Sequence, residues 1–261
     1  MQQASFDHYA AGYDYHFTFS PIGLLQRKQV YKQLLPVIDK NKTLLELNCG
    51  TGHDAIALLD HVKSILATDA SASMISVCEQ KIKTKTTRLV FKTISIQQIE
   101  NEIASAGFIF SNFGGLNCLS PLELKTFANK CSNLASEHTD LCFVVMGRKC
   151  FWERLYFISK FKFSKAFRRQ QKTGLKTQID TSELITWYYS PKDIKQLFGS
   201  AFEVRTYSPI GLFVPPSYLN AFFENKKKLL DLCATMDNVF GNFKWLANYG
   251  DHFYIHLKKT H

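Results

Sequence analysis

The chain has 261 residues, of which 46% are hydrophobic and 21% charged, as is typical of one globular domain with a sizeable core. Its first residues lack the basic and apolar stretches of a secretory signal, and the uncharged run 103–122 holds too many Gly, Asn and Ser residues for a membrane span. The seven cysteines form no CxxC pair, which excludes a typical zinc site or disulfide framework. We expect a soluble protein with buried thiols in a reducing cytoplasm, and no structural metal.

The positive charge is concentrated in one segment. The formal net charge is +10, and between Arg148 and Lys176 ten Lys or Arg residues stand against one acid, Glu153, which leaves +9 there. The basic character therefore belongs to this segment and not to the surface as a whole.

The first 150 residues predict alternating strands and helices. After a helix expected over about 24–38, the strand 43–48 leads through a glycine turn into a helix over 53–61. A second strand, 64–68, ends at Asp69, and Ser71 is expected to cap a helix that runs to Lys81. The next expected elements are strands over 88–91 and 107–110, a helix over 121–136 and a strand over 141–146.

The remainder of the chain adds fewer elements. We expect a strand over 184–189, a helix opened by Ser190-Pro191, and strands over 202–207 and 252–257 with helical sequence between them. Strands that alternate with helices favour an α/β fold. The predicted architecture is a doubly wound, mostly parallel seven-stranded sheet with helices on both faces and an antiparallel last strand.

The stretch that carries chemical information is Leu44-Leu-Glu-Leu-Asn-Cys-Gly-Thr-Gly-His-Asp54. Gly50 and Gly52 allow the backbone to pass close to a ligand, and the following helix presents its N-terminal amides to it. Asp69 stands 19 positions after Gly50 at the end of the next strand, where a carboxylate can accept both ribose hydroxyls of a nucleoside. The pattern predicts a nucleoside-binding site.

A nicotinamide-dependent dehydrogenase is one alternative, because Gly50-Thr-Gly-His-Asp-Ala55 fits the GxGxx(G/A) pattern. Glu46, four residues before Gly50, argues against it, since an acid there would repel a pyrophosphate and favour a cationic ligand. Tyr156-Phe-Ile-Ser-Lys160 also fits the YxxxK pattern of short-chain dehydrogenases, but the Ser expected about a dozen residues earlier is absent.

The motif Glu46-Leu-Asn-Cys-Gly-Thr-Gly52 resembles the ELGCGTG signature of the class I S-adenosylmethionine-dependent methyltransferases, and the similarity covers about residues 5–150. The resemblance implies that the cofactor is S-adenosylmethionine, that Glu46, Gly50 and Gly52 surround its methionine part, and that Asp69 holds its ribose. The other contacts implied by the family are Ala70 and Met74 flanking the adenine, Ser95 and Ile96 beside the adenine amine, and Ser111, Asn112 and Phe113 beneath the transferred methyl.

The sequence departs from the family pattern at two positions. Asn48 replaces the first glycine of the signature, which would narrow the site or add a polar contact. Ser95 replaces the usual Asp and would weaken the adenine contact. Four parts of a single domain are expected on this basis: an N-terminal helical cap (1–40), the cofactor-binding core (41–147), a basic aromatic insertion or lid (148–190) and the C-terminal completion (191–261).

No catalytic residue is assigned, because a sulfonium already carries a good leaving group and methyl transfer depends chiefly on geometry. His8, His16 and His252 are candidate bases. Cys118 follows the fourth strand and is a candidate nucleophile of the type used by cytosine-5 methyltransferases. Those enzymes have a Pro before the Cys, and none precedes Cys118, so a buried thiol is the preferred interpretation. Val214-Pro-Pro-Ser-Tyr218 is similar to a motif of enzymes that methylate planar amines, yet it lies too far along the chain and is interpreted as a turn.

Candidate substrate contacts come from two segments. Tyr9 and Tyr13 are N-terminal aromatics of the kind that close over the cofactor in similar enzymes. Trp152, Arg168 and Arg169 belong to the basic segment, where rings and cations suit a planar acceptor with an acidic group. That segment is interpreted as a lid, as a surface for anionic lipid, as a nucleic-acid patch, or as a solvated helix face.

The function predicted from these features is methyl transfer from S-adenosylmethionine to a small molecule of aromatic or acidic character. An RNA-binding or RNA-modifying protein on the same scaffold is the alternative from another class.

Overall fold

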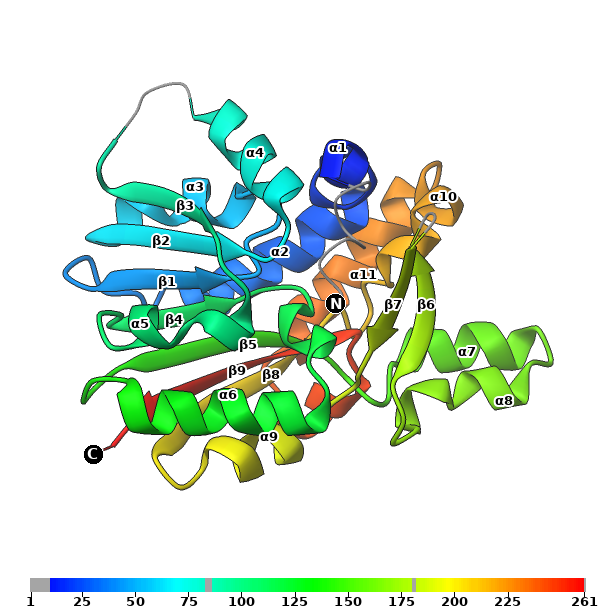
Figure 1. Cartoon of the computed structure of the whole chain (residues 1–261). Coiled ribbons are helices and arrows are strands. Elements are labelled where there is room, and N and C mark those ends of the chain that lie inside the picture. The colour runs from blue at the N-terminus through cyan, green and yellow to red at the C-terminus, as the bar shows by residue number, and fades with distance from the viewer. Residues whose placement is uncertain (1–9, 83–85, 180–181, 261) are drawn as a thin grey trace.

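The structure is a computed structural model that describes residues 10–82, 86–179 and 182–260. A seven-stranded sheet with the strand order β3-β2-β1-β4-β5-β9-β8 forms its centre (Figure 1). The strands are β1 (Thr43–Leu47), β2 (Ser64–Asp69), β3 (Leu89–Thr93), β4 (Phe108–Ser111), β5 (Asp140–Met146), β8 (Phe202–Ile210) and β9 (His252–Lys259).

The strand directions confirm the predicted fold class. The neighbouring strands from β3 to β5 all pair in parallel, whereas β9 pairs antiparallel with both β5 and β8. Parallel strands bring their carboxyl ends to one edge of the sheet, where ligands bind in doubly wound folds.

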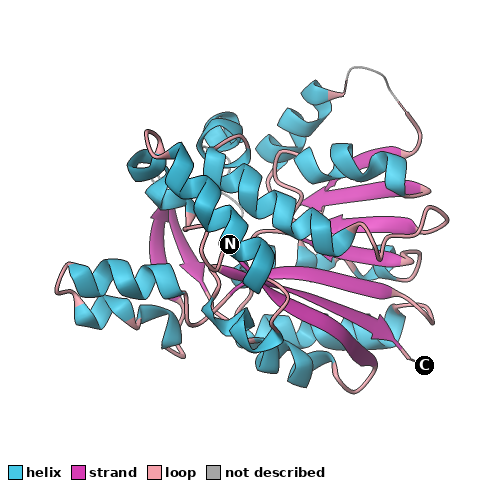
Figure 2. Ribbon diagram, turned by 180° about the vertical axis from the view of Figure 1, so that it is seen from behind, coloured by secondary structure: helices cyan, strands magenta, loops and turns pink. Residues whose placement is uncertain are grey.

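Helices cover both faces of the sheet, as Figures 1 and 2 show from opposite sides. Figure 1 has α5, α6 and α9 in front and α2, α3 and α11 behind. Their bounds are α2 (Pro21–Leu34), α3 (His53–Leu58), α4 (Ala72–Lys81), α5 (Glu100–Ile103), α6 (Pro121–Leu134), α9 (Pro191–Phe198) and α11 (Lys227–Phe240), and the short helices are α1 (Ala10–Tyr13) and α10 (Asn220–Phe223).

The core consists of one hydrophobic cluster on each face of the sheet. Successive side chains of a strand point to opposite faces, so Leu45 and Phe143 pack in one cluster while Leu44 and Val144 pack in the other. Both faces are buried, which explains why the central strands are almost entirely apolar.

Side-chain caps set the starts of several helices. Ser71 accepts a hydrogen bond from the Met74 amide and caps α4, as predicted. The first long helix differs from the expected range 24–38: it begins at Pro21 because the Ser20 hydroxyl caps it by accepting from the Gly23 amide, and it ends at Leu34.

The segment after β5 differs most from expectation. It forms α7 (Phe151–Ser159) and α8 (Phe163–Ala166), followed by a two-stranded antiparallel sheet of β6 (Leu175–Ile179) and β7 (Ser182–Thr186). The strand expected over 184–189 is therefore corrected to β7, which pairs with β6 and not with the main sheet. Figure 1 shows the α7–α8 hairpin projecting away from the main sheet, beyond β6 and β7.

Within the described ranges, no helix is both long and apolar enough to span a bilayer.

Candidate functional site

A cavity of about 640 Å³ lies at the carboxyl edge of the sheet. The ends of β1, β2 and β4 contribute one wall, and β7 contributes residues on another side. Of the residues predicted to contact the cofactor, the cavity is lined by Asn48, Gly50, Asp69, Ala70, Met74, Ser95, Ile96, Asn112 and Phe113. Glu46, Gly52 and Ser111 are not among the lining residues.

The turn after β1 is held in a left-handed backbone conformation at three positions. Asn48, Gly50 and Gly52 have φ values of 52°, 54° and 73°. Asn tolerates this region better than most residues, so Asn48 can replace the family glycine without changing the path of the turn. At Gly52 a Cβ atom would approach Cys78 and Phe91 to 2.9 Å, so a larger residue would have to displace both.

Asp69 links this turn to the end of β2. Its Oδ2 accepts a hydrogen bond from the Gly50 amide at 2.9 Å, and its Oδ1 accepts one from the Ser71 amide at 2.9 Å. The carboxylate is thereby oriented at the cavity wall, where it has the capacity to accept further hydrogen bonds from a ligand.

Glu46 lies beneath the turn and is only 1% exposed. Its Oε2 is without a hydrogen-bond partner among the described residues. Burial, followed by the charge of Asp54, raises the pKa of Glu46 well above its usual value. A cation near this carboxyl group would supply the partner that it lacks.

Asp54, whose charge helps to raise the pKa of Glu46, accepts hydrogen bonds from three side chains. It accepts from Arg27 Nε at 2.8 Å, from the Tyr31 hydroxyl at 2.5 Å and from Asn112 Nδ2 at 2.9 Å. Burial raises its pKa, but Arg27 and these hydrogen bonds outweigh burial, and the pKa of Asp54 is lowered overall. The pKa values of these two neighbouring acids are therefore shifted in opposite directions.

Two further buried acceptors lie close together beside Glu46. The Asn48 Oδ1 and Ser111 Oγ atoms are both without a hydrogen-bond partner in the part of the chain that the structure describes. A Cβ atom built on Gly115 would lie 2.8 Å from each of these two oxygens, so both of them face the space beside Gly115. Buried polar atoms are rarely left unsatisfied, and this group suits a ligand that donates several hydrogen bonds.

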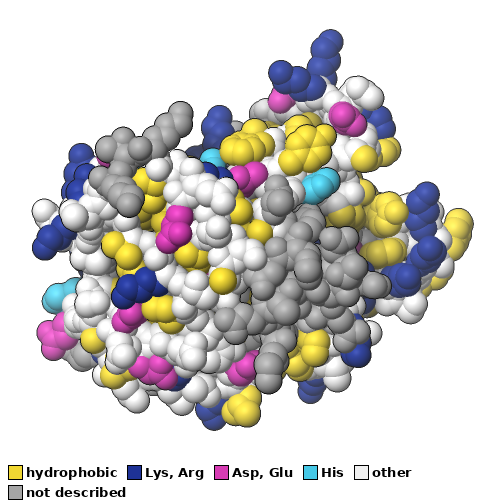
Figure 3. All heavy atoms as spheres, turned by 45° about the horizontal axis from the view of Figure 1, so that its top comes forward, with side chains coloured by type: hydrophobic (Ala, Val, Ile, Leu, Met, Phe, Trp, Pro, Cys, Tyr) yellow, Lys and Arg dark blue, Asp and Glu magenta, His cyan; other side chains and the backbone are white. Residues whose placement is uncertain are grey.

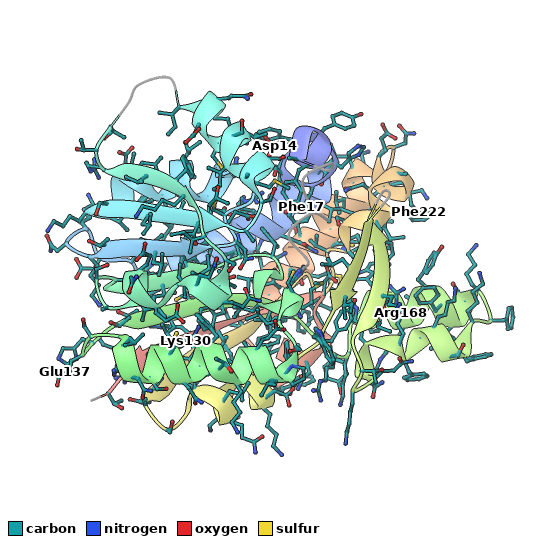
Figure 4. All side chains as sticks on the ribbon, viewed as in Figure 1. Asp14, Phe17, Lys130, Glu137, Arg168 and Phe222 are labelled. Carbon is teal, nitrogen blue, oxygen red and sulfur yellow. The ribbon has the colours of Figure 1, made fainter. Side chains whose placement is uncertain are left out.

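The N-terminal segment is fastened over the glycine turn. Asp14 accepts from the Thr51 hydroxyl at 2.6 Å and pairs with Lys81 at 2.5 Å, and the adjacent Tyr13 lines the cavity. Figure 4 shows Asp14 and Phe17 at this end of the molecule, near α1 and α4. Tyr9 and His8, also proposed for this region, lie outside the described residues.

The opposite wall was not foreseen from the sequence. Leu184, Ile185 and Trp187 come from β7 and the residues after it. Trp187 is tied to the 3-10 turn Gly115–Cys118 that follows β4, because its amide donates to Asn117 O at 2.8 Å and its carbonyl accepts from Asn117 Nδ2 at 2.5 Å. The remaining lining residues are Ser71, Gln97, Gln98, Gly114, Gly115, Cys118, Leu119, Ser120 and Glu123.

Cys118 lines the cavity but is unsuited to act as a nucleophile. Burial raises the pKa of its thiol to about 12, so the reactive thiolate is scarcely formed near neutral pH. The candidate base His252 is buried against the Phe113 ring, with ring centroids 5.6 Å apart, while His16 is exposed. Neither histidine belongs to the lining of the cavity.

The structure does not bring Trp152, Arg168 and Arg169 to the cavity, which corrects their assignment as substrate contacts. Arg169 is buried and pairs with Glu153 at 2.9 Å and with Asp251 at 2.8 Å. Arg168 pairs with Glu153 and lies by the α7–α8 hairpin in Figure 4, well separated from Asp14. Both guanidinium groups are thus engaged within the protein and are not directed at a substrate.

The described part of the chain contains no group of three or more His, Cys, Asp or Glu side chains placed to hold a metal ion.

Comparisons with known proteins agree with this geometry. Residues 44–137 match a family model described as a methyltransferase domain. None of the curated proteins matches the chain.

Solved structures match nearly the whole chain. The chain is similar to the N-methyltransferase NodS from Bradyrhizobium japonicum in complex with S-adenosyl-L-homocysteine, with 11% identity, 93% of this chain and 90% of that chain covered, and a TM-score of 0.57. A SAM-dependent methyltransferase from Methanosarcina mazei shares 13% identity over 88% of this chain and 98% of that chain, with a TM-score of 0.59. The DhpI–SAH complex shares 12% identity over 99% and 95% of the two chains, with a TM-score of 0.61.

At these identities the similarity to solved structures concerns the fold. The match of residues 44–137 decides between the two interpretations of the glycine turn, against the dehydrogenase and for the methyltransferase. Residues 44–137 thus form a methyltransferase domain, and the chain as a whole has the fold of the S-adenosylmethionine-dependent methyltransferases to which it is similar.

Proposed function

We propose that the cavity binds S-adenosylmethionine together with a small-molecule acceptor, and that the enzyme methylates this acceptor. The observation that carries the proposal is the composition of the cavity, in which Asp69 and the glycine turn lie on one side and Leu184 and Trp187 on another. Its volume of about 640 Å³ falls within the range typical of small-molecule sites.

The residues present fit the cofactor. Asp69 would accept the ribose hydroxyls, and Met74 and Ile96 would flank the adenine. Of the unsatisfied acceptors, Asn48 Oδ1 belongs to the cavity lining and would receive an N–H donor of the ammonium group, whereas Glu46 and Ser111 do not line the cavity. The fit is also electrostatic, because a cationic ligand would lower the pKa of Glu46, which burial raises.

The bound cofactor supplies a methyl group on a sulfonium, which is electrophilic without further activation. The protein then has to hold the acceptor in line with this methyl and exclude water. Phe113 and Tyr13 supply apolar surface at the cavity, and Asn112 is fixed by its hydrogen bond to Asp54. We assign no general base.

The acceptor side favours a planar or apolar molecule. Trp187 offers an indole ring, and Leu184 and Leu119 add aliphatic surface. The acidic group suggested by Arg168 and Arg169 is no longer part of the proposal, since both side chains are paired with acids of the protein.

RNA is the second candidate acceptor, because of the +9 charge between residues 148 and 176. None of the residues 148–176 lines the cavity, which favours the small molecule. We also propose that the enzyme works in the cytoplasm, a location supported by the free, mostly buried thiols of its cysteines.

The decisive experiment is incubation with methyl-labelled S-adenosylmethionine and a cell extract, followed by separation of small molecules, RNA and lipid. We expect label in a small-molecule fraction. Trp187→Ala should reduce this labelling while the affinity for S-adenosylhomocysteine changes by less than about twofold. Trp245→Ala, a change at an exposed position on the surface, is the matched control and should leave both unchanged. Label only in RNA would overturn the small-molecule proposal.

A further inference from the structure

The α7–α8 hairpin carries the most exposed aromatic surface that is unrelated to the cavity. At its tip, Phe161 is 82% exposed and Phe163 is 57% exposed. The turn between the two helices places Phe161 in a left-handed conformation with φ of 56°, and the two rings lie 6.5 Å apart. Figure 3 shows yellow hydrophobic and dark blue basic side chains interleaved on the lobe at its right.

One face of α7 extends this apolar surface. Phe151, Leu155 and Ile158 recur at the spacing i, i+4 and i+7, which places them on one side of the helix. All three are exposed, and they are aliphatic as well as aromatic. An apolar stripe of this kind, left exposed on a helix, is a feature of surfaces that bind a partner.

Cations surround the exposed rings. Lys160, Lys162 and Lys165 flank Phe161 and Phe163, and none of the three pairs with an acid among the described residues. The sequence contains no Asp or Glu between Arg154 and Ile179. The tip is therefore both apolar and strongly positive.

The base of the hairpin is fixed to the domain. Glu153 of α7 binds Arg168 and Arg169, and Arg169 continues to Asp251 at the start of β9. Trp152 Nε1 donates to Phe213 O at 2.6 Å. These contacts hold the hairpin in a defined position, so its exposed surface is presented on a rigid support.

We propose that the α7–α8 hairpin docks on an anionic lipid bilayer, with Phe161, Phe163 and the exposed face of α7 entering the interface and Lys160, Lys162 and Lys165 pairing with lipid phosphates. Aromatic and aliphatic residues combined with Lys are the composition of interfacial membrane anchors. This binding surface is separate from the cavity and does not depend on the identity of the acceptor.

Other partners fit this surface less well. Single-stranded RNA is bound in basic grooves on which bases stack. This hairpin projects from the domain (Figure 1), and its surface includes Leu155 and Ile158, which offer no stacking plane. A second copy of the chain would bring two lysine-rich tips together with like charges. An anionic bilayer satisfies both the apolar and the positive groups at once.

The test is co-sedimentation with vesicles of phosphatidylcholine containing phosphatidylglycerol, compared with vesicles of phosphatidylcholine alone. We expect the protein to bind the anionic vesicles. Lys160→Glu with Lys162→Glu should weaken binding at least tenfold. The matched control, Lys40→Glu with Lys63→Glu, changes the net charge equally at exposed positions of the main domain and should cost less than about twofold.

The apolar part is tested separately. Phe161→Ser with Phe163→Ser should also reduce vesicle binding at least tenfold, and should do so at high salt as well as low salt. In Phe161→Trp, lipids with brominated acyl chains should quench the fluorescence of the added tryptophan. Equal losses for the tip and control charge reversals, absence of binding to anionic vesicles, or tip-dependent binding to single-stranded RNA in place of vesicles would each overturn the proposal.

Discussion

The Gly50 amide and the Asp69 carboxylate are joined by a hydrogen bond of 2.9 Å that connects the turn after β1 to the end of β2. One residue thus both shapes the turn and presents its charge to the cavity. We expect Asp69→Ala to weaken S-adenosylhomocysteine binding at least tenfold, which corresponds to about 1.4 kcal/mol, in a calorimetric titration.

The control for this change is Asp60→Ala, which removes an exposed acid and should leave the affinity unaltered. Tighter binding of NAD than of S-adenosylhomocysteine would contradict the assignment of the cavity.

Glu46 should make the stability of the ligand-free protein depend on pH. Burial and the charge of Asp54 raise its pKa in the folded chain, so the folded chain binds more protons than the unfolded chain above the ordinary value of 4.5. Its contribution to stability is present below that value and is lost as the pH rises through the raised value. The melting temperature of Glu46→Gln relative to wild type should therefore increase with pH across this window, and a constant difference would refute the argument.

Arg27 should contribute strongly to stability through a buried ion pair. Its Nε donates to Asp54 at 2.8 Å, and both side chains are buried. Arg27→Leu leaves a buried carboxylate without its cation and should destabilise the protein by about 3–5 kcal/mol in urea unfolding. Arg205→Leu, which removes an exposed pair with Glu203, should cost less than about 1 kcal/mol. Similar losses for the two variants would show that burial of the pair has no energetic consequence.

The two glycines of the turn should respond differently to substitution. Gly50→Ala meets only Tyr13 at 3.8 Å, and its left-handed backbone should cost about 1–2 kcal/mol. Gly52→Ala shares that backbone cost and also forces a Cβ to within 2.9 Å of Cys78 and Phe91. The melting temperature of Gly52→Ala should therefore be lower than that of Gly50→Ala. The reverse order would mean that the turn relaxes more easily than its packing implies.

Local features of the sequence were sufficient to predict the central sheet, and nine of the residues expected at the cofactor line the cavity. Short apolar runs predict the strands β1 and β2, and Glu46, Gly50 and Asp69 lie in or directly after them. Ser71 then caps the helix that follows β2. Each of these signals depends on a few neighbouring residues.

The wall formed by Leu184, Ile185 and Trp187 depends on contacts between distant residues, which the sequence alone did not reveal. Trp187 reaches the cavity because Asn117, 70 residues earlier, binds its carbonyl. Arg169 resembles a free cation in sequence, yet its partner Asp251 is 82 residues away. A run of basic residues indicates that acidic partners are needed, but the fold determines whether these acids belong to the same protein.

The position of β9 between β5 and β8 has a consequence for folding during synthesis. Until residues 252–259 leave the ribosome, β5 has one open edge and β8 has no strand that joins it to the sheet. The apolar residues of β5 and the Cys142 thiol, which contacts the Tyr254 hydroxyl, then lack their cover. An open apolar edge favours pairing with other chains, so a nascent chain that stalls before β9 should be a target for chaperones, although its methyltransferase motif is already complete.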